Sequence, residues 1–256
     1  MCFRHLAGSS DFGRRFDLLA RCRQHAVDDP TRIRAVTFDV GGTLIAPWPS
    51  VGHVYAEVAA SHGIANLSPD ELECRFASAF HRRERSPSTA EEWAEIVDET
   101  FAGLVAEPPS RTFFPELYER FARPGAWRVF EDVLPTLATL KERGVRLGVI
   151  SNWDDRLRPL LTSLDLSHHF ESIIVSCEIG ASKPSPAPFL AAAKALGAPP
   201  DRILHVGDSF DMDIAGARAA GLPALQIVRD PNVVVAGQIR SLSDVPAQVL
   251  AGKAAG

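Results

Sequence analysis

The sequence predicts an α/β protein, with a three-layer core built on a parallel sheet and one inserted helical segment. Two patterns in the 256 residues indicate this fold. Five short apolar runs alternate with helical patterns, and a long segment after the first run is helical throughout. Hydrophobic residues make up 46% and charged residues 23% of the chain, which is ordinary for a soluble domain with a sizeable core.

The alternation begins at residues 34–40, RAVTFDV, a short β-branched run that predicts a buried strand. Residues 131–144 place leucines and valines at helical spacing and end on Gly144, a frequent helix terminator. The remaining elements follow in alternation: strands at 145–151, 171–176, 202–208 and 223–228, and helices at 154–165, 185–197 and 213–221. Such an order is typical of βαβ units and a parallel sheet.

One segment interrupts the alternation, because residues 46–127 have a helical period throughout. Its apolar stripes are Val51, Val54, Tyr55 and Val58; Leu72, Phe76 and Phe80; and Trp93, Ile96, Val97, Phe101, Leu104 and Val105. We interpret nearly all of these side chains as simple helix packing. The chain therefore divides into an N-terminal extension (1–30), a core (31–45 and 128–256) and a helical module (46–127).

Charge and composition exclude some classes of function. A net charge of -5 and a pI of about 5.9 leave no electrostatic footprint for nucleic acid. No apolar run reaches the length of a membrane span, and the first 30 residues lack the apolar region of a secretory signal. We expect a cytoplasmic protein without nucleic-acid or membrane partners, either a monomer or a homodimer.

Polar residues follow the predicted strands in order. The first strand ends on Asp39, the second on Ser151 and Asn152, and the third is followed by a loop with Lys183. The fourth leads into an acidic cluster: Asp208, Asp211 and Asp213. In an open parallel sheet ligands bind outside the carboxyl ends of the strands, so these groups are expected to converge on one site.

Phosphoryl transfer is the chemistry that fits this set of groups. Asp39 and Asp208 can hold Mg²⁺ with water and substrate oxygens, and Asp39 can attack phosphorus to form an aspartyl phosphate. Lys183 would neutralise the charge that develops. The Ser151 hydroxyl and nearby backbone N–H groups would bind the phosphoryl oxygens of a small phosphorylated metabolite.

The motifs FDVGGTL, VISN, SKPSP and HVGDSFDMD resemble those of the haloacid dehalogenase-like hydrolase superfamily, in the subfamily with a helical cap after the first strand. The resemblance extends over about residues 34–230. It implies a Rossmann-like core with a flavodoxin-like strand order, and a cap at residues 46–127 that closes over the site.

Carried over by position, the resemblance makes Asp39 the nucleophile, Ser151 a phosphate ligand, Lys183 the motif lysine and Asp208 a magnesium ligand. It makes Asp213 a supporting acid or a water-mediated ligand. The other implied contacts are the Gly41 carbonyl for the metal and, for the substrate, Asn152 and the backbone of Val40 and Gly41.

Gly41 departs from the family pattern, in which an aspartate two residues after the nucleophile protonates the leaving oxygen. Losing one general acid typically slows turnover by about 10²–10⁴-fold. A good leaving group, such as an acyl or aryl phosphate, needs little protonation. His53 is a candidate replacement acid, and an exposed helix residue is the alternative interpretation.

Two other hypotheses remain open. The first is a haloacid dehalogenase: members of this type also lack the second aspartate, but they work without metal and typically have uncharged residues in place of Asp208 and Asp213. The second is a phosphate- and Mg²⁺-binding protein with weak or no turnover and a regulatory or interaction role. A phosphonatase-type reaction is excluded, because those members need a cap lysine and residues 46–127 contain no lysine.

Overall fold

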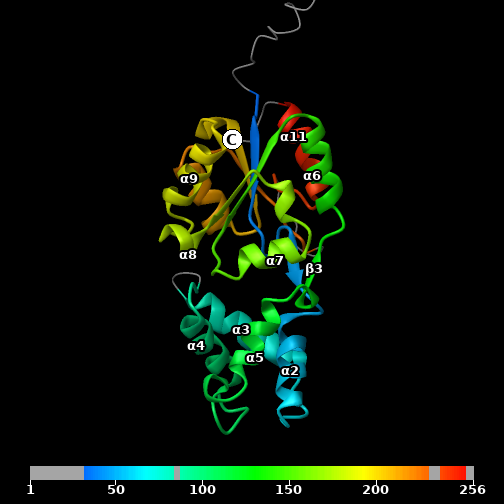
Figure 1. The fold of residues 1–256 in the computed structure, drawn as a ribbon, viewed down its shortest axis with the longest axis vertical. Coiled ribbons are helices and arrows are strands. Elements are labelled where there is room, and N and C mark those ends of the chain that lie inside the picture. Colours follow the sequence, from blue (N-terminus) through cyan, green and yellow to red (C-terminus); the bar gives the residue numbers. More distant parts are fainter. Residues whose placement is uncertain (1–31, 84–86, 231–236, 252–256) are drawn as a thin grey trace, which may run out of the picture. The chain divides into compact units, whose positions relative to one another are not determined.

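A computed structural model describes residues 32–83, 87–230 and 237–251. The expected N-terminal extension, residues 1–30, lies outside the described residues. The core of the described chain is a five-stranded parallel sheet in the order β5-β4-β1-β6-β7 (Figure 1). Its strands, in chain order, are β1 (Ala35–Phe38), β4 (Arg146–Ser151), β5 (Ser172–Val175), β6 (Ile203–Gly207) and β7 (Ala224–Gln226).

The predicted fold class is confirmed, but the strand order differs from the flavodoxin-like order in one detail. Counted along the chain, the sheet strands run 3-2-1-4-5, which is the Rossmann order 3-2-1-4-5-6 without its last strand. The chain adds β4 and β5 outward on one side of β1 and then crosses to add β6 and β7 on the other. The topological switch point therefore lies at β1, and side chains following β1, β4 and β6 surround the crevice at its carboxyl end.

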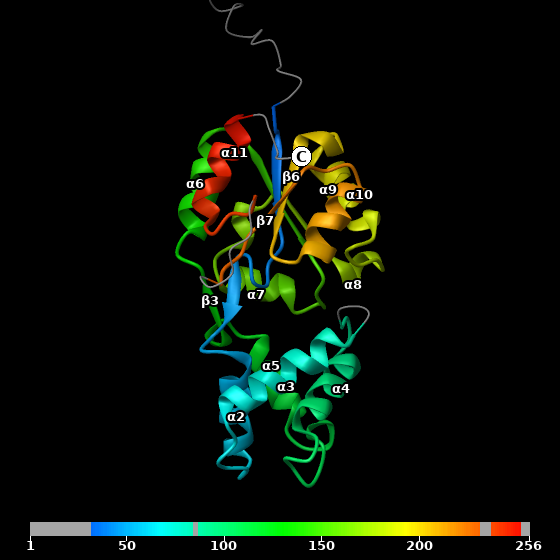
Figure 2. The same cartoon turned by 180° about the vertical axis from the view of Figure 1, so that it is seen from behind.

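Two apolar layers pack on the two faces of this sheet. One face buries leucines and valines of α6 (Val133–Glu142), α7 (Leu157–Ser163) and α11 (Val245–Ala251). The other face is covered by α9 (Pro186–Leu196) and α10 (Gly216–Ala219), as the second view shows (Figure 2). Gly197 follows α9 and has a φ of +57°, the left-handed conformation expected of a glycine that ends a helix.

Helices also fill the segment between β1 and β4, as the sequence indicates, and they have a core of their own. They are α2 (Val51–Ser61), α3 (Pro69–His81), α4 (Ala90–Phe101) and α5 (Phe114–Phe121). Side-chain oxygens of Ser50, Ser68 and Thr89 accept backbone N–H groups and start the first three helices. Helices α2 and α3 pack very closely at Gly52, where a Cβ would lie 2.0 Å from the Pro69 carbonyl oxygen.

The ends of this helical segment form a feature that the helical period did not predict. β2 (Ile45–Pro47) and β3 (Trp127–Val129) pair antiparallel, with Ile45 opposite Val129. The chain thus enters and leaves the helices through one two-stranded ribbon. A second difference follows β6, where a π-helical turn, Phe210–Ala215, replaces the start of the helix expected at 213–221.

Candidate active site

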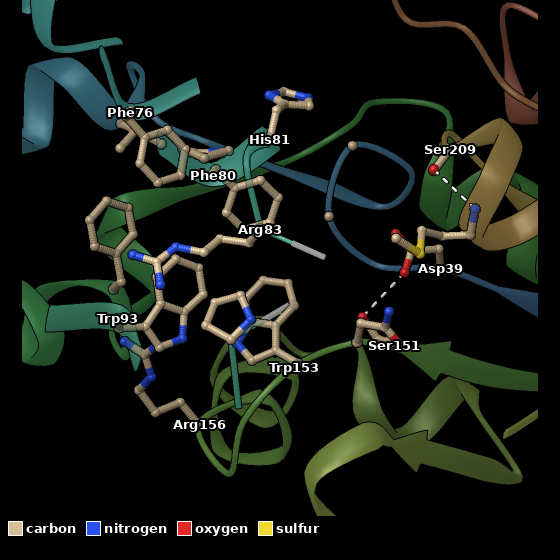
Figure 3. A pocket seen from close by; sticks show the side chains of 18 of the residues that line it. Asp39, Phe76, Phe80, His81, Arg83, Trp93, Ser151, Trp153, Arg156 and Ser209 are labelled. Carbon is tan, nitrogen blue, oxygen red and sulfur yellow. Dashed lines mark hydrogen bonds between the residues drawn. The ribbon is translucent and has the colours of Figure 1, made fainter. Parts of the chain in front are cut away.

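Asp39 lies just past the end of β1, where its backbone N–H donates to the Val206 carbonyl of β6 at 2.9 Å. The side chain is buried, and its Oδ1 accepts from Lys183 Nζ at 2.7 Å. The same oxygen accepts from the Ser151 hydroxyl at 3.2 Å (Figure 3). Burial raises the pKa of Asp39 although the Lys183 ammonium opposes this. A further positive charge here would favour the ionised carboxylate.

Lys183 is only 3% exposed and bridges two carboxylates, because its Nζ also donates to Asp213 Oδ1 at 2.5 Å. Burial alone would lower its pKa, but Asp213 and Asp39 raise it above the usual range, so the ammonium stays charged. The Asn152 amide fixes the lysine backbone from both sides. It accepts from the Lys183 N–H at 2.8 Å and donates to the Lys183 carbonyl at 2.9 Å.

His205 and Thr37 extend this network beneath the site. His205 is fully buried in β6, with Nε2 3.1 Å from Asp213 Oδ1 and Nδ1 3.0 Å from the Thr37 hydroxyl. Burial lowers the pKa of His205, which favours the neutral ring. That ring can donate from Nε2 to the carboxylate and accept from the hydroxyl at Nδ1. Although Asp213 is itself buried, Lys183 and His205 hold its pKa below the usual range.

Asp208 completes an acidic cluster that fits a divalent cation. One carboxylate oxygen each from Asp39, Asp208 and Asp213 lie within 4.8 Å of one another. Three carboxylates with the single Lys183 ammonium leave two excess negative charges, which one Mg²⁺ would balance. Surrounding protein atoms, together with repulsion from Asp39 and Asp213, raise the pKa of Asp208 to about 7 although its side chain is exposed to the cavity.

Glycines make room for this cluster. A Cβ on Gly42, whose φ is +74°, would lie 2.4 Å from Asp208 Oδ2, so a side chain there would displace the carboxylate. Gly41 is different, because its φ is outside the left-handed region and a Cβ would only contact the Trp153 ring at 3.5 Å. Asp211 lines the cavity nearby but stands outside the three-carboxylate cluster.

A cavity of about 590 Å³ opens from Asp39 and Gly41 toward helices α2–α5. Lys183, Ser151, Asn152, Asp208 and Asp213 all line it, so the structure brings the predicted polar groups together. Val40 is buried and does not line the cavity among the described residues. Val40 accepts from Leu44 and Ile45 and so shapes the turn after Asp39.

Several cavity residues were interpreted from the sequence as helix packing. Phe76, Phe80 and Trp93 are half-buried and line the cavity, as does Arg83 (Figure 3). A helical period cannot distinguish a ring packed on a neighbour from one facing a cavity. His53 does not line the cavity; it is exposed, and its Nδ1 lies 3.0 Å from the Ser50 hydroxyl.

A buried polar hub joins the helical segment to the loop after β4. Asp154 is 1% exposed and accepts from the Trp93 indole N–H at 2.8 Å and from Arg156 at 2.6 Å. The Arg156 guanidinium lies 3.6 Å from the Tyr118 ring centroid. This loop directly follows Ser151, so the contacts of Asp154 and Arg156 tie the end of β4, which carries the phosphate-binding candidate, to α4 and α5.

A family model described as haloacid dehalogenase-like hydrolase matches residues 33–221. The chain belongs to this family. Haloacid dehalogenase-like hydrolase domain-containing protein 3 of Mus musculus is 33% identical over 203 residues, 75% of this chain and 80% of that protein. The phosphoglycolate phosphatase of Salmonella choleraesuis (strain SC-B67) is 30% identical over 217 residues, 80% of this chain and 85% of that protein.

Among solved structures, a haloacid dehalogenase-like (HAD) phosphatase from Thermococcus onnurineus matches with a TM-score of 0.62 and 27% identity. The match covers 87% of this chain and 100% of that chain. The expectations of a haloacid dehalogenase-like hydrolase and of its α/β fold are therefore confirmed. No helix among the residues that the structure describes is long and apolar enough to cross a membrane.

Proposed function

We propose that the protein is a Mg²⁺-dependent phosphohydrolase that acts on a small phosphorylated substrate through an aspartyl phosphate on Asp39. The observation that carries this proposal is the position of Asp39 at the base of the cavity. Its Oδ1 is held by Lys183 and Ser151, beside the Asp208 and Asp213 carboxylates. Its relatives include a phosphoglycolate phosphatase.

In the first step the Asp39 carboxylate attacks phosphorus, and the bond from phosphorus to the leaving oxygen breaks with its electron pair on that oxygen. Lys183 and the Ser151 hydroxyl are placed to stabilise the phosphoryl oxygens in the transition state. Bound Mg²⁺, held by Asp39, Asp208, Asp213 and the Gly41 carbonyl, would supply charge neutralisation. Water then hydrolyses the acyl phosphate and regenerates the Asp39 carboxylate, with inorganic phosphate as product.

Gly41 specialises this chemistry, because no carboxyl follows the nucleophile to protonate the leaving oxygen. Among the described residues, His81 is the histidine that lines the cavity, at the exposed end of α3. Because no carboxyl at position 41 can protonate the leaving oxygen, we propose that the enzyme favours leaving groups that depart as anions. The Asp208 and Asp213 carboxylates argue against a metal-independent dehalogenase, because such enzymes typically carry uncharged residues at these two positions.

Residues 46–127 are proposed to act as a cap that shapes the substrate pocket. Support comes from the cavity, whose wall includes side chains of α2–α5 opposite Asp39. The hub at Asp154 would hold this cap against the loop that carries Ser151 and Asn152. A cap of this kind excludes water during the first step.

Hydrolysis of acetyl phosphate and p-nitrophenyl phosphate with and without Mg²⁺ tests the proposal, with Asp39→Asn as the control. Turnover that requires Mg²⁺ and disappears in Asp39→Asn is the expected result. Binding of phosphate and Mg²⁺ without turnover would instead support the binding-protein alternative. Metal-independent chloride release from 2-chloropropionate would overturn the proposal in favour of a dehalogenase.

A further inference from the structure

The cavity that meets Asp39 has an aromatic wall. Nine Phe, Tyr and Trp side chains line it, and several are half-buried with surface left toward the cavity. Phe80 and Trp93 stack with centroids 6.1 Å apart, while Trp127 and Trp153 lie 5.2 Å apart. Rings that are not covered by protein present π faces on which a planar ligand can stack.

The aromatic wall reaches the reacting end of the site at Trp153. Its ring carbon Cζ3 lies 3.5 Å from where a Gly41 Cβ would be, so an indole borders the position of the missing acid. The Trp153 backbone is fixed: its N–H donates to the Ser176 hydroxyl at 3.0 Å and its carbonyl accepts from that hydroxyl at 3.1 Å. The leaving group thus meets an indole at the place where the family pattern, with an aspartate two residues after the nucleophile, would present a carboxyl.

The cations at this wall are already engaged. Arg156 is paired with Asp154 at 2.6 Å, and Arg83 pairs with Glu95 at 2.8 Å and Glu99 at 3.7 Å. A substrate with a second anionic group beyond its phosphate would have to compete with these carboxylates. The wall therefore suits a substrate whose only anionic group is its phosphate better than one that also bears a carboxylate.

Leaving-group chemistry points to the same class of substrate. A phenol has a pKa of about 10, whereas an alcohol resembles water, at about 15.7. A phenolate can therefore depart from phosphorus with far less need for a general acid. The absent carboxyl at Gly41 and the indole beside it are two independent features that both favour an aryl leaving group.

We propose that the substrate is a small aryl phosphate monoester, and that Trp153 determines this specificity by stacking on the aromatic leaving group. This inference rests on the proposed function for its chemistry. The balanced reaction is hydrolysis of the phosphorus–oxygen bond, which gives a phenol and inorganic phosphate and consumes one water.

The test compares kcat/KM for 1-naphthyl phosphate with kcat/KM for acetyl phosphate, which has a good leaving group but no ring. We expect the ratio to fall about tenfold in Trp153→Leu and to be mostly retained in Trp153→Phe, since an aromatic contact is worth about 2- to 12-fold. Trp48→Leu removes an exposed ring that does not line the cavity and serves as the matched control. If Trp153 variants do not fold, Phe80→Leu and Phe80→Tyr provide the same comparison.

The outcomes separate this inference from the proposed function. Asp39-dependent turnover of acetyl phosphate with an unchanged ratio in Trp153→Leu overturns the aryl preference and leaves the hydrolase standing. If acetyl phosphate turnover does not depend on Asp39, the proposed function fails, and calorimetric binding decides the inference. Tighter binding of 1-naphthylmethylphosphonate than of methylphosphonate, lost in Trp153→Leu, supports stacking; equal binding of the two phosphonates overturns it.

Discussion

Restoring a carboxyl at position 41 should speed the hydrolysis of alkyl phosphates. Gly41 can accept the change, because its φ lies outside the left-handed region. A Cβ there meets only the Trp153 ring, at an ordinary contact distance of 3.5 Å. Gly41→Asp therefore tests a missing chemical group without forcing the backbone, whereas Gly42→Asp would push against Asp208.

The expected gain follows from the value of a general acid, about 10²–10⁴-fold in rate, or about 3–5 kcal/mol of transition-state stabilisation. A newly introduced aspartate is not oriented by its surroundings, and the indole of Trp153 restricts it. We therefore expect a smaller gain, of about 10- to 100-fold, for glycerol phosphate. Hydrolysis of p-nitrophenyl phosphate, whose leaving group needs little protonation, should change by less than about 3-fold.

The assay is kcat/KM for both substrates at saturating Mg²⁺, since a further carboxylate also alters metal affinity. Gly41→Asn is the matched control, because it has nearly the same shape but no transferable proton. A gain on glycerol phosphate that is equal in Gly41→Asp and Gly41→Asn would refute the reasoning. No gain in either variant would mean that the missing acid does not limit turnover.

Three further predictions concern charge and stability. Because the pKa of Asp208 is raised to about 7, the folded state binds a proton that the unfolded chain has lost. In EDTA the Tm should therefore rise as pH falls from 8.5 to 7, and a Tm that falls over this range would contradict the shift. Lys183→Met removes the ammonium between two buried carboxylates and should lower the free energy of unfolding in urea by about 3–5 kcal/mol. Asp154→Ala breaks the buried pair with Arg156 and should also lower the free energy of unfolding by about 3–5 kcal/mol. Asp155 is exposed, and Asp155→Ala should leave the free energy of unfolding almost unchanged.

The polar half of the site could be predicted because strand ends are visible in sequence. Asp39, Ser151, Lys183 and Asp208 each follow an apolar run, and parallel topology brings those ends to one edge. In the structure Asp39, Ser151 and Lys183 contact one another through their side chains, and a carboxylate oxygen of Asp208 lies close to Asp39. Topology alone therefore accounts for their convergence.

Other parts of the site could not be predicted, for physical reasons. His205 stands inside an apolar strand, and its partner Asp213 becomes a neighbour only when the π-helical turn folds back. Phe80 and Trp93 have the period of packed helix residues, and only the tertiary arrangement leaves them facing a cavity. The three-residue strands β2 and β3 are too short for an alternating pattern to be recognised.

The β2–β3 ribbon makes the helical segment an exchangeable module. Its two connections lie side by side, with Ile45 opposite Val129, and they are hydrogen-bonded from the Phe130 N–H to the Leu44 carbonyl at 3.1 Å and from the Trp48 N–H to the Ala126 carbonyl at 2.8 Å. The points of entry and exit therefore stay adjacent whatever lies between them. A different set of helices could be grafted at this junction without moving β1 or the aspartate that follows it. The part of the cavity wall that α2–α5 supply can thus change separately from Asp39 and its neighbouring carboxylates, on either side of two short strands.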